Sequence, residues 1–178
     1  MLLKPKNTEK LQYLTFIAAI SVVESIKKIY KLNTSIKWPN DVHYKKKKLC
    51  GILTEGIFGE RSSVVVGIGL NVNQRKFSRE ISNTATSLRI TKHRFFNIKS
   101  FAHEIITRFF YLYNNYYNKN KFDYIARFWM KYCDTINKNV RVTSRTKSIY
   151  GKAVGIDNDC NLLLELKNGE IIKIVEGD

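Results

Sequence analysis

The first regular pattern along the chain is helical. Between Thr8 and about Ile29, apolar residues recur three and four positions apart, and Asn7 or Thr8 is available as N-cap. The apolar positions of this segment are Leu11, Leu14, Ile17, Ala18, Val22, Ile26 and Ile29. This spacing places them on one face, so the segment is predicted to be a long amphipathic helix that faces the core.

The chain then changes to patterns that are typical of β-strands. Ser35 to Trp38 is predicted to be a short strand, because Pro39-Asn40-Asp41 directly after it favours a turn or an irregular loop. Beyond that turn we expect a hairpin and then one more strand. The hairpin has arms at 42–44 and 49–58 and a tip at 45–48, and the further strand at 62–70 follows a turn at 59–61.

The run from Val64 to Gly69 contains only apolar residues and glycine. A strand with this composition is predicted to lie in the centre of a sheet, with both of its faces covered. Its glycines, Gly67 and Gly69, indicate a place where another group approaches the backbone closely.

The second half of the chain returns to helical spacing and ends in strands. After a polar, irregular stretch at 73–89, the segments Ile98–Tyr117 and Phe122–Tyr132 are predicted to be helices that cover the sheet. Short strands are expected at 140–143, 149–156, 162–166 and 171–175, with turns at 157–159 and 168–169. These strands form an all-β module that is too small to be stable alone, so we divide the chain into a main unit at 1–136 and a β module at 137–178.

The composition excludes several classes of protein. With 178 residues, of which 44% are hydrophobic, the chain can bury a core, and this excludes a wholly disordered protein. Cys50, Cys133 and Cys160 form no C-x-x-C pair, so neither a zinc site nor a secreted disulfide framework is expected. The apolar run at the start of the given sequence is too short for a signal peptide, and no later apolar run approaches the length of a membrane span. We therefore expect a soluble protein of the reducing cytoplasm without a membrane partner.

The net charge of +16 would ordinarily point to nucleic acid as a partner. The sequence, however, holds 22 Lys, 20 Ile and 16 Asn against 6 Ala, a skew toward residues with A/T-rich codons, and the lysines are scattered along the chain. The basic surplus is therefore attributed to base composition, and no specific nucleic-acid partner is expected. Phosphate binding on a smaller scale stays open.

Polar groups stand at the ends of predicted strands in three motif segments, Lys37–Asp41, Lys48–Glu55 and Gly67–Asn73. Loops at strand ends let a rigid sheet present a carboxylate, an amide and an ammonium group to one ligand. Glycines within these segments would let a flat ligand lie directly on the backbone. Because the three segments are adjacent in a meander, we expect their ends to line one pocket.

Each segment also has a simpler interpretation. Pro39-Asn40-Asp41 alone is most often a turn, and Lys45–Lys48 is most often a solvated hairpin tip. Gly67–Asn71 lacks the third glycine and the following helix of a phosphate-binding G-x-G-x-x-G loop. Thr107 stands where a zinc protease would need a second histidine after His103. The histidines, His43, His93 and His103, are therefore expected to be surface or structural residues.

Taken together, the three motif segments resemble those of the biotin protein ligases, enzymes that attach biotin to acetyl-CoA carboxylase. The matching motifs are K-W-P-N-D at 37–41, K-L-x-G-I-L-x-E at 48–55, G-I-G-x-N-V-N at 67–73 and A-T-S-L at 85–88. The resemblance covers nearly the whole chain, and the C-terminal strands resemble the SH3-like domain of that family. It implies an α/β fold in which a mixed sheet with helices on one side, as in lipoate ligases and class II aminoacyl-tRNA synthetases, is followed by a small β-barrel.

The resemblance also implies an activity. Biotin protein ligases activate biotin with ATP as biotinyl-5′-AMP and pyrophosphate, then transfer the biotinyl group to a lysine of the biotin carboxyl carrier protein. ATP and Mg²⁺ are then the cofactors, biotin is the substrate and the carrier protein is the partner; a homodimer is compatible with the family. Two alternatives stay open: an impaired fragment that binds biotin or the carrier, and a lipoate-type acyl ligase, which would not be expected to combine K-W-P-N-D with this β module.

Roles for single residues follow from the same resemblance. Lys48 would be catalytic, binding the biotin carboxylate and the α-phosphate, with Asp41 beside it. Asn40, Asp41 and Asn71 would handle the nucleotide, and the last two would also meet the Mg²⁺ on its phosphates. Trp38 would form a wall of the site, and the glycines would accommodate biotin and the adenylate. The remaining substrate-binding residues of this set are Lys37, Gly51, Ile52, Gly67 and Gly69.

The chain departs from the family pattern at both ends. Family members carry, before the first long helix, a G-R-G-R-x-G-R loop that folds over the adenylate, and Gly-Arg-Gly does not occur in this sequence. Met1 is expected to lie inside a strand, and Glu176–Asp178 ends where the family usually has one more strand. We therefore expect a fragment or a late-starting gene product, without that loop and without an N-terminal DNA-binding domain.

Overall fold

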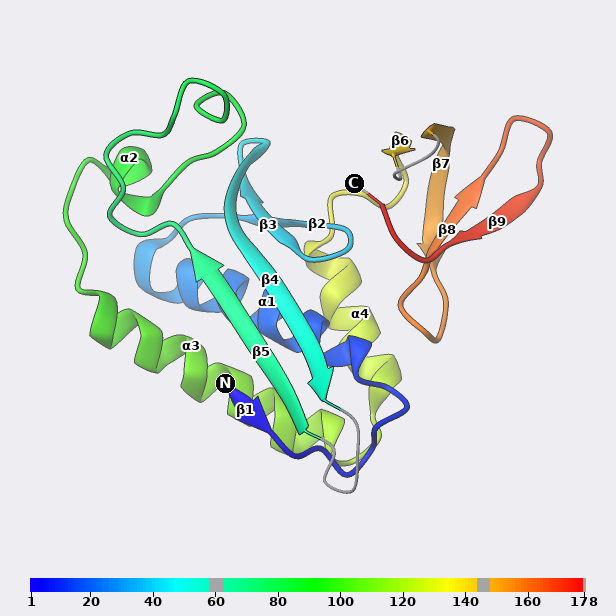
Figure 1. Cartoon of the computed structure of the whole chain (residues 1–178), viewed down its shortest axis with the longest axis horizontal. Helices are drawn as coiled ribbons and strands as arrows, with labels where there is room; N and C mark the ends of the chain where they lie inside the picture. Colours follow the sequence, from blue (N-terminus) through cyan, green and yellow to red (C-terminus); the bar gives the residue numbers. More distant parts are fainter. Residues whose placement is uncertain (58–62, 144–147, 178) are drawn as a thin grey trace.

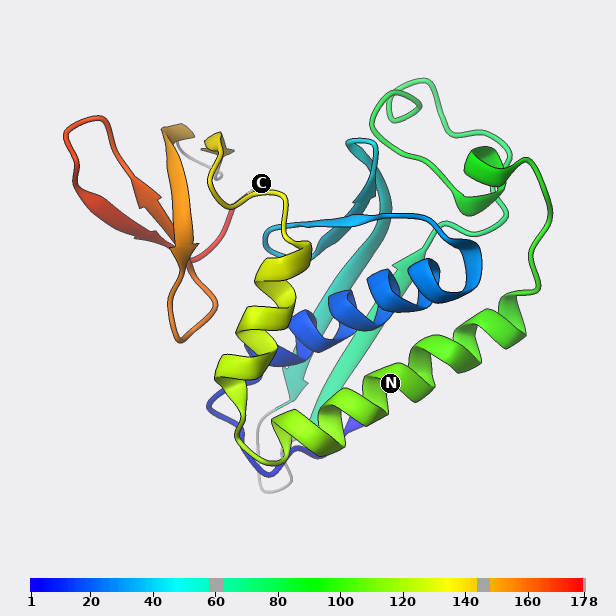
Figure 2. The same ribbon diagram turned by 180° about the vertical axis from the view of Figure 1, so that it is seen from behind.

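The computed structural model describes residues 1–57, 63–143 and 148–177. The helices are α1 (Gln12–Tyr30), α2 (Leu88–Lys92), α3 (Ile98–Leu112), the π-helix η1 (Tyr113–Tyr117) and α4 (Phe122–Tyr132). Helices α1, α3 and α4 lie on one face of a five-stranded sheet, and a four-stranded sheet stands beside them at the C-terminal end (Figures 1 and 2). The predicted α/β fold with a C-terminal β module is confirmed. Within the described ranges, every helix is too short or too polar to span a membrane.

The five-stranded sheet is a meander with one added edge strand. Its order is β1 (Leu2–Leu3), β5 (Ser63–Leu70), β4 (Lys47–Ile57), β3 (Asp41–Tyr44) and β2 (Ser35–Lys37). Neighbouring strands pair antiparallel, and the parallel contacts are isolated bridges, Ile36 with Cys133 and Lys48 with Ala85. The strands that carry the three motif segments are therefore neighbours in space as well as in sequence.

The prediction that both faces of the strand at 62–70 are covered is wrong for the described part of the chain. Val64 and Val66 are each 1% exposed and face the helices, whereas Val65 between them is 37% exposed. On the same open face, the neighbouring strand β4 exposes Leu53 and Ile57. An antiparallel sheet can leave one face to solvent, and a run of valine and glycine is apolar on either face, so composition did not reveal the difference.

Helix α1 begins later than its apolar pattern indicated. It starts at Gln12 with Leu11 as N-cap, and no side chain caps it. The Asn7 side chain instead accepts a hydrogen bond from the backbone N–H of Glu9 at 3.0 Å, a local turn that competes with helix capping. The core-facing role of the helix is confirmed, because it lies between the sheet and helices α3 and α4.

The hairpin tip between β3 and β4 is shorter than expected. Lys45 and Lys46 form the turn, with φ of 50° and 66°, and Lys47 already belongs to β4. Left-handed backbone at both turn positions matches the twist of the flanking strands. Lys48, which the sequence pattern placed at the tip, therefore lies inside a paired strand.

The remaining helices agree closely with the predicted segments. The helical segment at 98–117 is divided into α3 and η1, and α4 has the predicted bounds. The short helix α2 was missed, because it lies at the end of a stretch that reads as irregular. Ser87 caps it by accepting a hydrogen bond from the Ile90 N–H, a cap that holds the chain beside the sheet.

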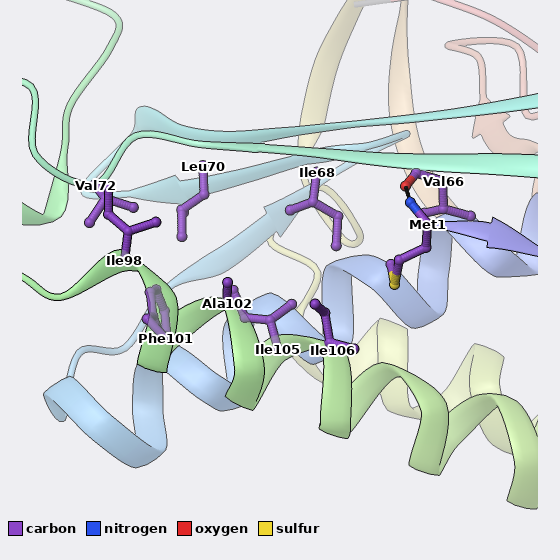
Figure 3. Close-up of a pocket in the computed structure, with 10 residues that line it drawn as sticks. All are labelled: Met1, Val66, Ile68, Leu70, Val72, Ile98, Phe101, Ala102, Ile105 and Ile106. Atoms are coloured by element: carbon purple, nitrogen blue, oxygen red, sulfur yellow. Dashed lines mark hydrogen bonds between the residues drawn. The ribbon is translucent and has the colours of Figure 1, made fainter.

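An apolar cavity of about 300 Å³ separates β5 from α3 (Figure 3). Ile68 and Leu70 on the strand face Phe101 and Ile105 on the helix. Met1 lies at its end, and the amino group of Met1 donates a hydrogen bond to the Val66 carbonyl at 2.7 Å. Met1 thus continues the pairing of β1 with β5. The apolar lining offers no polar side chain to orient a polar ligand.

The C-terminal sheet has the order β6 (Asn139–Thr143), β7 (Ser148–Ile156), β8 (Leu162–Glu165) and β9 (Ile171–Ile174). All four strands were predicted within two residues at either end, as expected where turns such as Asn168-Gly169 are strong local signals. Trp38 of the main unit donates its indole N–H to the Cys160 carbonyl in the turn before β8, and Lys10 forms an ion pair with Asp159 there. The division of the chain at 136/137 stays a prediction.

Candidate active site

A cavity of about 660 Å³ opens where the ends of β2, β3, β4 and β5 meet. From the sheet it is lined by Lys37, Asp41, His43, Lys46, Lys48, Gly51, Gly69 and Asn71. The 77–85 segment completes the lining with Phe77, Ile81, Thr84 and Ala85. The structure thus brings the three motif segments together around one space that is rich in positive charge.

Lys48 is held at this cavity by its backbone. Its N–H donates to the Thr84 carbonyl at 2.6 Å, and its carbonyl accepts from the Thr86 N–H at 2.9 Å. The side chain remains half-exposed, with its Nζ 2.8 Å from Asp41 Oδ1. The backbone bonds thus fix the base of the Lys48 side chain, and the ion pair with Asp41 orients its ammonium group.

The A-T-S-L segment at 85–88 supplies this support together with Thr84 directly before it, a role that its sequence did not reveal. It runs beside β4 in a parallel bridge between Lys48 and Ala85, and the Leu88 N–H donates to the Asn71 carbonyl at 3.0 Å. The Ser87 hydroxyl donates to the Gln74 carbonyl at 2.7 Å. The segment therefore joins the second and third motif segments through backbone hydrogen bonds to Lys48 and Asn71.

Asp41 begins β3, and its side chain is 13% exposed. Its Oδ1 pairs with Lys48, and its Oδ2 lies 3.8 Å from His43 Nε2. Burial raises the pKa of the Asp41 carboxyl, but the interactions with His43 and Lys48 outweigh it and hold the pKa below its ordinary value. Asp41 is therefore ionised at neutral pH and orients the Lys48 ammonium.

His43 is a site residue that sequence reasoning missed, because we expected a surface or structural histidine. It lines the cavity two positions after Asp41. Residues two apart in a strand point to the same face, so this spacing was the available signal.

Glycines keep the floor of the cavity open. Gly51 and Gly69 are opposite one another in the β4–β5 ladder. A Cβ on Gly51 would lie 3.2 Å from Lys48 Cε and 3.5 Å from Asp41 Oδ1, so a side chain there would crowd the ion pair. A Cβ on Gly69 would lie 3.5 Å from the Gly51 carbonyl oxygen. The backbone is thus accessible to a flat ligand directly beside Lys48.

The cysteines offer no reactive thiol in the structure. Cys50, Cys133 and Cys160 are free, and burial raises the pKa of each thiol, that of Cys50 to about 12. Nucleophilic catalysis by cysteine requires a thiolate, so a covalent thioester route at this cavity is disfavoured.

Two known families match the chain. Residues 2–73 match the biotin/lipoate A/B protein ligase family, and residues 135–178 match the biotin protein ligase C-terminal domain. The bifunctional ligase/repressor BirA of Bacillus spizizenii is 37% identical over 174 residues, which are 96% of this chain and 53% of that protein. The chain belongs to the biotin protein ligase family. It spans about half the length of the curated relatives it matches.

Solved biotin protein ligases share the fold. The Aquifex aeolicus ligase in complex with biotin and ATP superposes with a TM-score of 0.86 at 29% identity, covering 99% of this chain and 74% of that one. The Leishmania major ligase in complex with biotinyl-5-AMP gives a TM-score of 0.59 at 16% identity, covering 97% of this chain and 75% of that one, and this likeness shows the fold alone.

Several residues to which the ligase resemblance gave a substrate-binding role lie outside the cavity lining. Trp38 is 4% exposed and bonded to the C-terminal turn, and the side chain of Ile52 is 2% exposed in the core. Asn40 donates its side-chain amide to the Ile52 carbonyl at 2.7 Å. Gly67, which also lies outside the lining, pairs with Leu53 next to the Gly51–Gly69 pair, on the same open face of the sheet. Trp38, Ile52 and Asn40 fit support of the cavity better than contact within it, whereas the role of Gly67 in binding stays a prediction.

The cavity offers few oxygen ligands for Mg²⁺. Asp41 and Asn71 both line it, and they offer one carboxylate and one amide oxygen. Within the described ranges, no cluster of three acidic, histidine or cysteine residues could hold a metal ion. Mg²⁺ is commonly bound by one or two carboxylates together with substrate phosphates. The residues fit an ion that arrives on a nucleotide.

Proposed function

We propose that this chain carries the active site of a biotin protein ligase, which joins biotin and ATP to form biotinyl-5′-AMP and passes the biotinyl group to a lysine of the biotin carboxyl carrier protein of acetyl-CoA carboxylase. The observation that supports this most directly is the Lys48 ammonium, held 2.8 Å from Asp41 beside the bare backbone of Gly51 and Gly69. A carboxylate and a phosphate could both reach that ammonium.

In the first step, a carboxylate oxygen of biotin bonds to the α-phosphorus of ATP. The bond from that phosphorus to the bridging oxygen breaks, and pyrophosphate leaves with the electron pair. Both reactants are anions, so their approach is opposed by charge. Lys48 offsets this repulsion, and Lys37 and Lys46 add positive charge to the cavity. Mg²⁺ on the phosphates, met by Asp41 and Asn71, would neutralise further charge.

In the second step, the neutral amine of the carrier lysine bonds to the acyl carbon of the adenylate. The bond from that carbon to the phosphate oxygen breaks, AMP leaves, and the amine loses one proton. Asp41 is a weak base, because its pKa lies below its ordinary value. Its role in both steps is therefore to orient the Lys48 cation, and the amine proton passes to solvent or phosphate.

The proposal also includes the cellular compartment and the macromolecular partners. Three free cysteines fit a reducing compartment, and we place the protein in the cytoplasm. The carrier protein is the macromolecular partner, no specific nucleic acid is assigned, and the family likeness is compatible with a homodimer.

A labelled-biotin assay tests the proposal. The chain is incubated with ATP, Mg²⁺ and ¹⁴C-biotin, and the acyl-adenylate is trapped with hydroxylamine; a biotin carrier domain is then added and its labelling is followed. We expect biotin-dependent adenylate and a labelled carrier lysine. Replacing biotin by lipoate is the matched control, and equal labelling with lipoate would identify a lipoate-type ligase. Biotin binding without adenylate would indicate a binding fragment.

A further inference from the structure

Trp38 connects the active-site loop to the C-terminal region at two points. Its indole N–H donates to the Cys160 carbonyl at 3.0 Å, and its backbone N–H donates to Thr135 Oγ1 at 3.0 Å. Cys160 lies in the turn before β8, and Thr135 lies in the linker between α4 and β6. A residue of the K-W-P-N-D segment is thus held by two parts of the chain about one hundred residues away.

The carbonyl that receives the indole N–H is itself firmly placed. The Asp157 carboxylate accepts hydrogen bonds from the backbone N–H groups of Asp159 and Asn161 at 2.8 and 2.9 Å, and Lys173 pairs with it at 2.6 Å. The Cys160 N–H donates to the Asp157 carbonyl at 3.1 Å. A turn closed by this many bonds offers a rigid acceptor rather than a mobile one.

The other side of the active-site loop is also clamped. Asn40 exchanges two hydrogen bonds with Ile52, its carbonyl accepting at 3.0 Å and its amide donating at 2.7 Å. Lys37 and Asp41, which flank the loop, are partners in the β2–β3 ladder and line the cavity. A shift of Trp38 therefore reaches Asp41 through a short, bonded loop that has little freedom to absorb it.

We propose that Trp38 is a positioning residue, through which the docking of the C-terminal sheet sets the place of Asp41 and thereby of the Lys48 ammonium. The inference rests on the proposed ligase function and deepens it, because it makes the C-terminal sheet part of the active site's geometry. Trp38 acts from behind the cavity, without contact to the ligand.

Trp38→Phe tests this, with Trp129→Phe as its matched control. Trp129 is also fully buried, stacked on Phe16 at 4.2 Å between ring centroids, but its indole N–H has no hydrogen-bond partner among the described residues. Both variants remove an indole from the core. Only Trp38→Phe removes a bond between the C-terminal turn and the active-site loop.

The first readout is the pKa of Asp41, followed by ¹³C NMR of its carboxyl group without any ligand. Lys48 and His43 interact with this carboxylate, and Lys37 and Lys46 line the same cavity. We expect the pKa to rise in Trp38→Phe, because a displaced carboxylate loses contact with Lys48, and to stay unchanged in Trp129→Phe.

The second readout is binding of a non-hydrolysable biotinyl-adenylate analogue, an acyl sulfamate, by calorimetry. We expect about fivefold weaker binding in Trp38→Phe, in the range for loss of one buried hydrogen bond, and wild-type affinity in Trp129→Phe. If Trp38→Phe does not fold, the amino acid 3-benzothienylalanine replaces Trp38 in a protein that also carries Trp129→Phe. This analogue keeps the shape of the indole ring but lacks its N–H donor.

An unchanged Asp41 pKa in folded Trp38→Phe protein, or an equal change in Trp129→Phe, would overturn the inference and leave Trp38 as a core residue. The carboxyl titration needs no ligand. Failure of the wild-type chain to bind the analogue would therefore count against the proposed function, while the titration still decides the role of Trp38.

Discussion

Replacement of Lys48 by alanine should slow adenylate formation more than replacement of any neighbouring lysine. Lys48 Nζ lies 2.8 Å from Asp41 Oδ1, and its backbone is bonded on both sides to Thr84 and Thr86. A hydrogen bond to a charged group contributes about 1.5–3 kcal/mol. Since 1.4 kcal/mol corresponds to about tenfold, the rate should fall by roughly tenfold to a hundredfold.

The assay is single-turnover formation of biotinyl-5′-AMP from α-³²P-ATP, with Lys45→Ala as the control. Lys45 lies in the hairpin turn at φ 50°, close in sequence but outside the cavity lining. Its replacement should change the rate by less than about twofold, in keeping with a solvated side chain. An equal loss in Lys45→Ala and Lys48→Ala would refute the assignment of the chemistry to Lys48.

The same substitution should change stability with pH. Burial raises the pKa of Asp41, but His43 and Lys48 hold it below its ordinary value. A carboxyl with a lowered folded-state pKa stabilises the fold above its unfolded pKa, and this stability is lost as pH falls through the folded value. The difference in free energy of unfolding between wild type and Lys48→Ala should therefore be largest near neutral pH and shrink in acid. Urea unfolding at several pH values measures it, and a constant difference would contradict the ion-pair mechanism.

Three further predictions concern the glycines and the basic charge. In Gly51→Ala the new Cβ would lie 3.2 Å from Lys48 Cε, so we expect slower adenylate formation in the same assay. Gly155→Ala is the control and should leave the rate unchanged, because its Cβ would meet nothing closer than 4.0 Å. In Gly67→Val the nearest atom to the Cβ is the Leu53 carbonyl oxygen at 3.6 Å, so circular dichroism should show an intact fold. Calorimetry should show that the variant has lost biotin binding, and an unchanged biotin affinity would give Gly67 a structural role only. Binding to duplex DNA in a gel-shift titration should be about micromolar or weaker at physiological salt and should fall steeply with added salt; a nanomolar complex that discriminates against a scrambled duplex would contradict this.

Local patterns were sufficient for most of the elements. The helical spacing at 122–132 and the turn-bounded strands of the C-terminal sheet appear nearly where predicted, because each depends on periodicity and turn chemistry within about ten residues. The meeting of the three motif segments could also be inferred, because consecutive strands joined by short turns become neighbours in a meander. The sequence by itself thus determined the elements and the edge of the sheet at which polar groups gather.

Tertiary structure decided which groups point into the cavity and what holds them there. Period-two alternation states that Val64 and Val66 share a face, but only the packed helices determine that this face is buried and that of Val65 is open. Trp38 turns toward Cys160, 122 residues away, and no local preference encodes such a contact. The physical reason is that local propensity acts through the backbone of neighbouring residues, whereas burial and long-range hydrogen bonds exist only once distant segments have packed together.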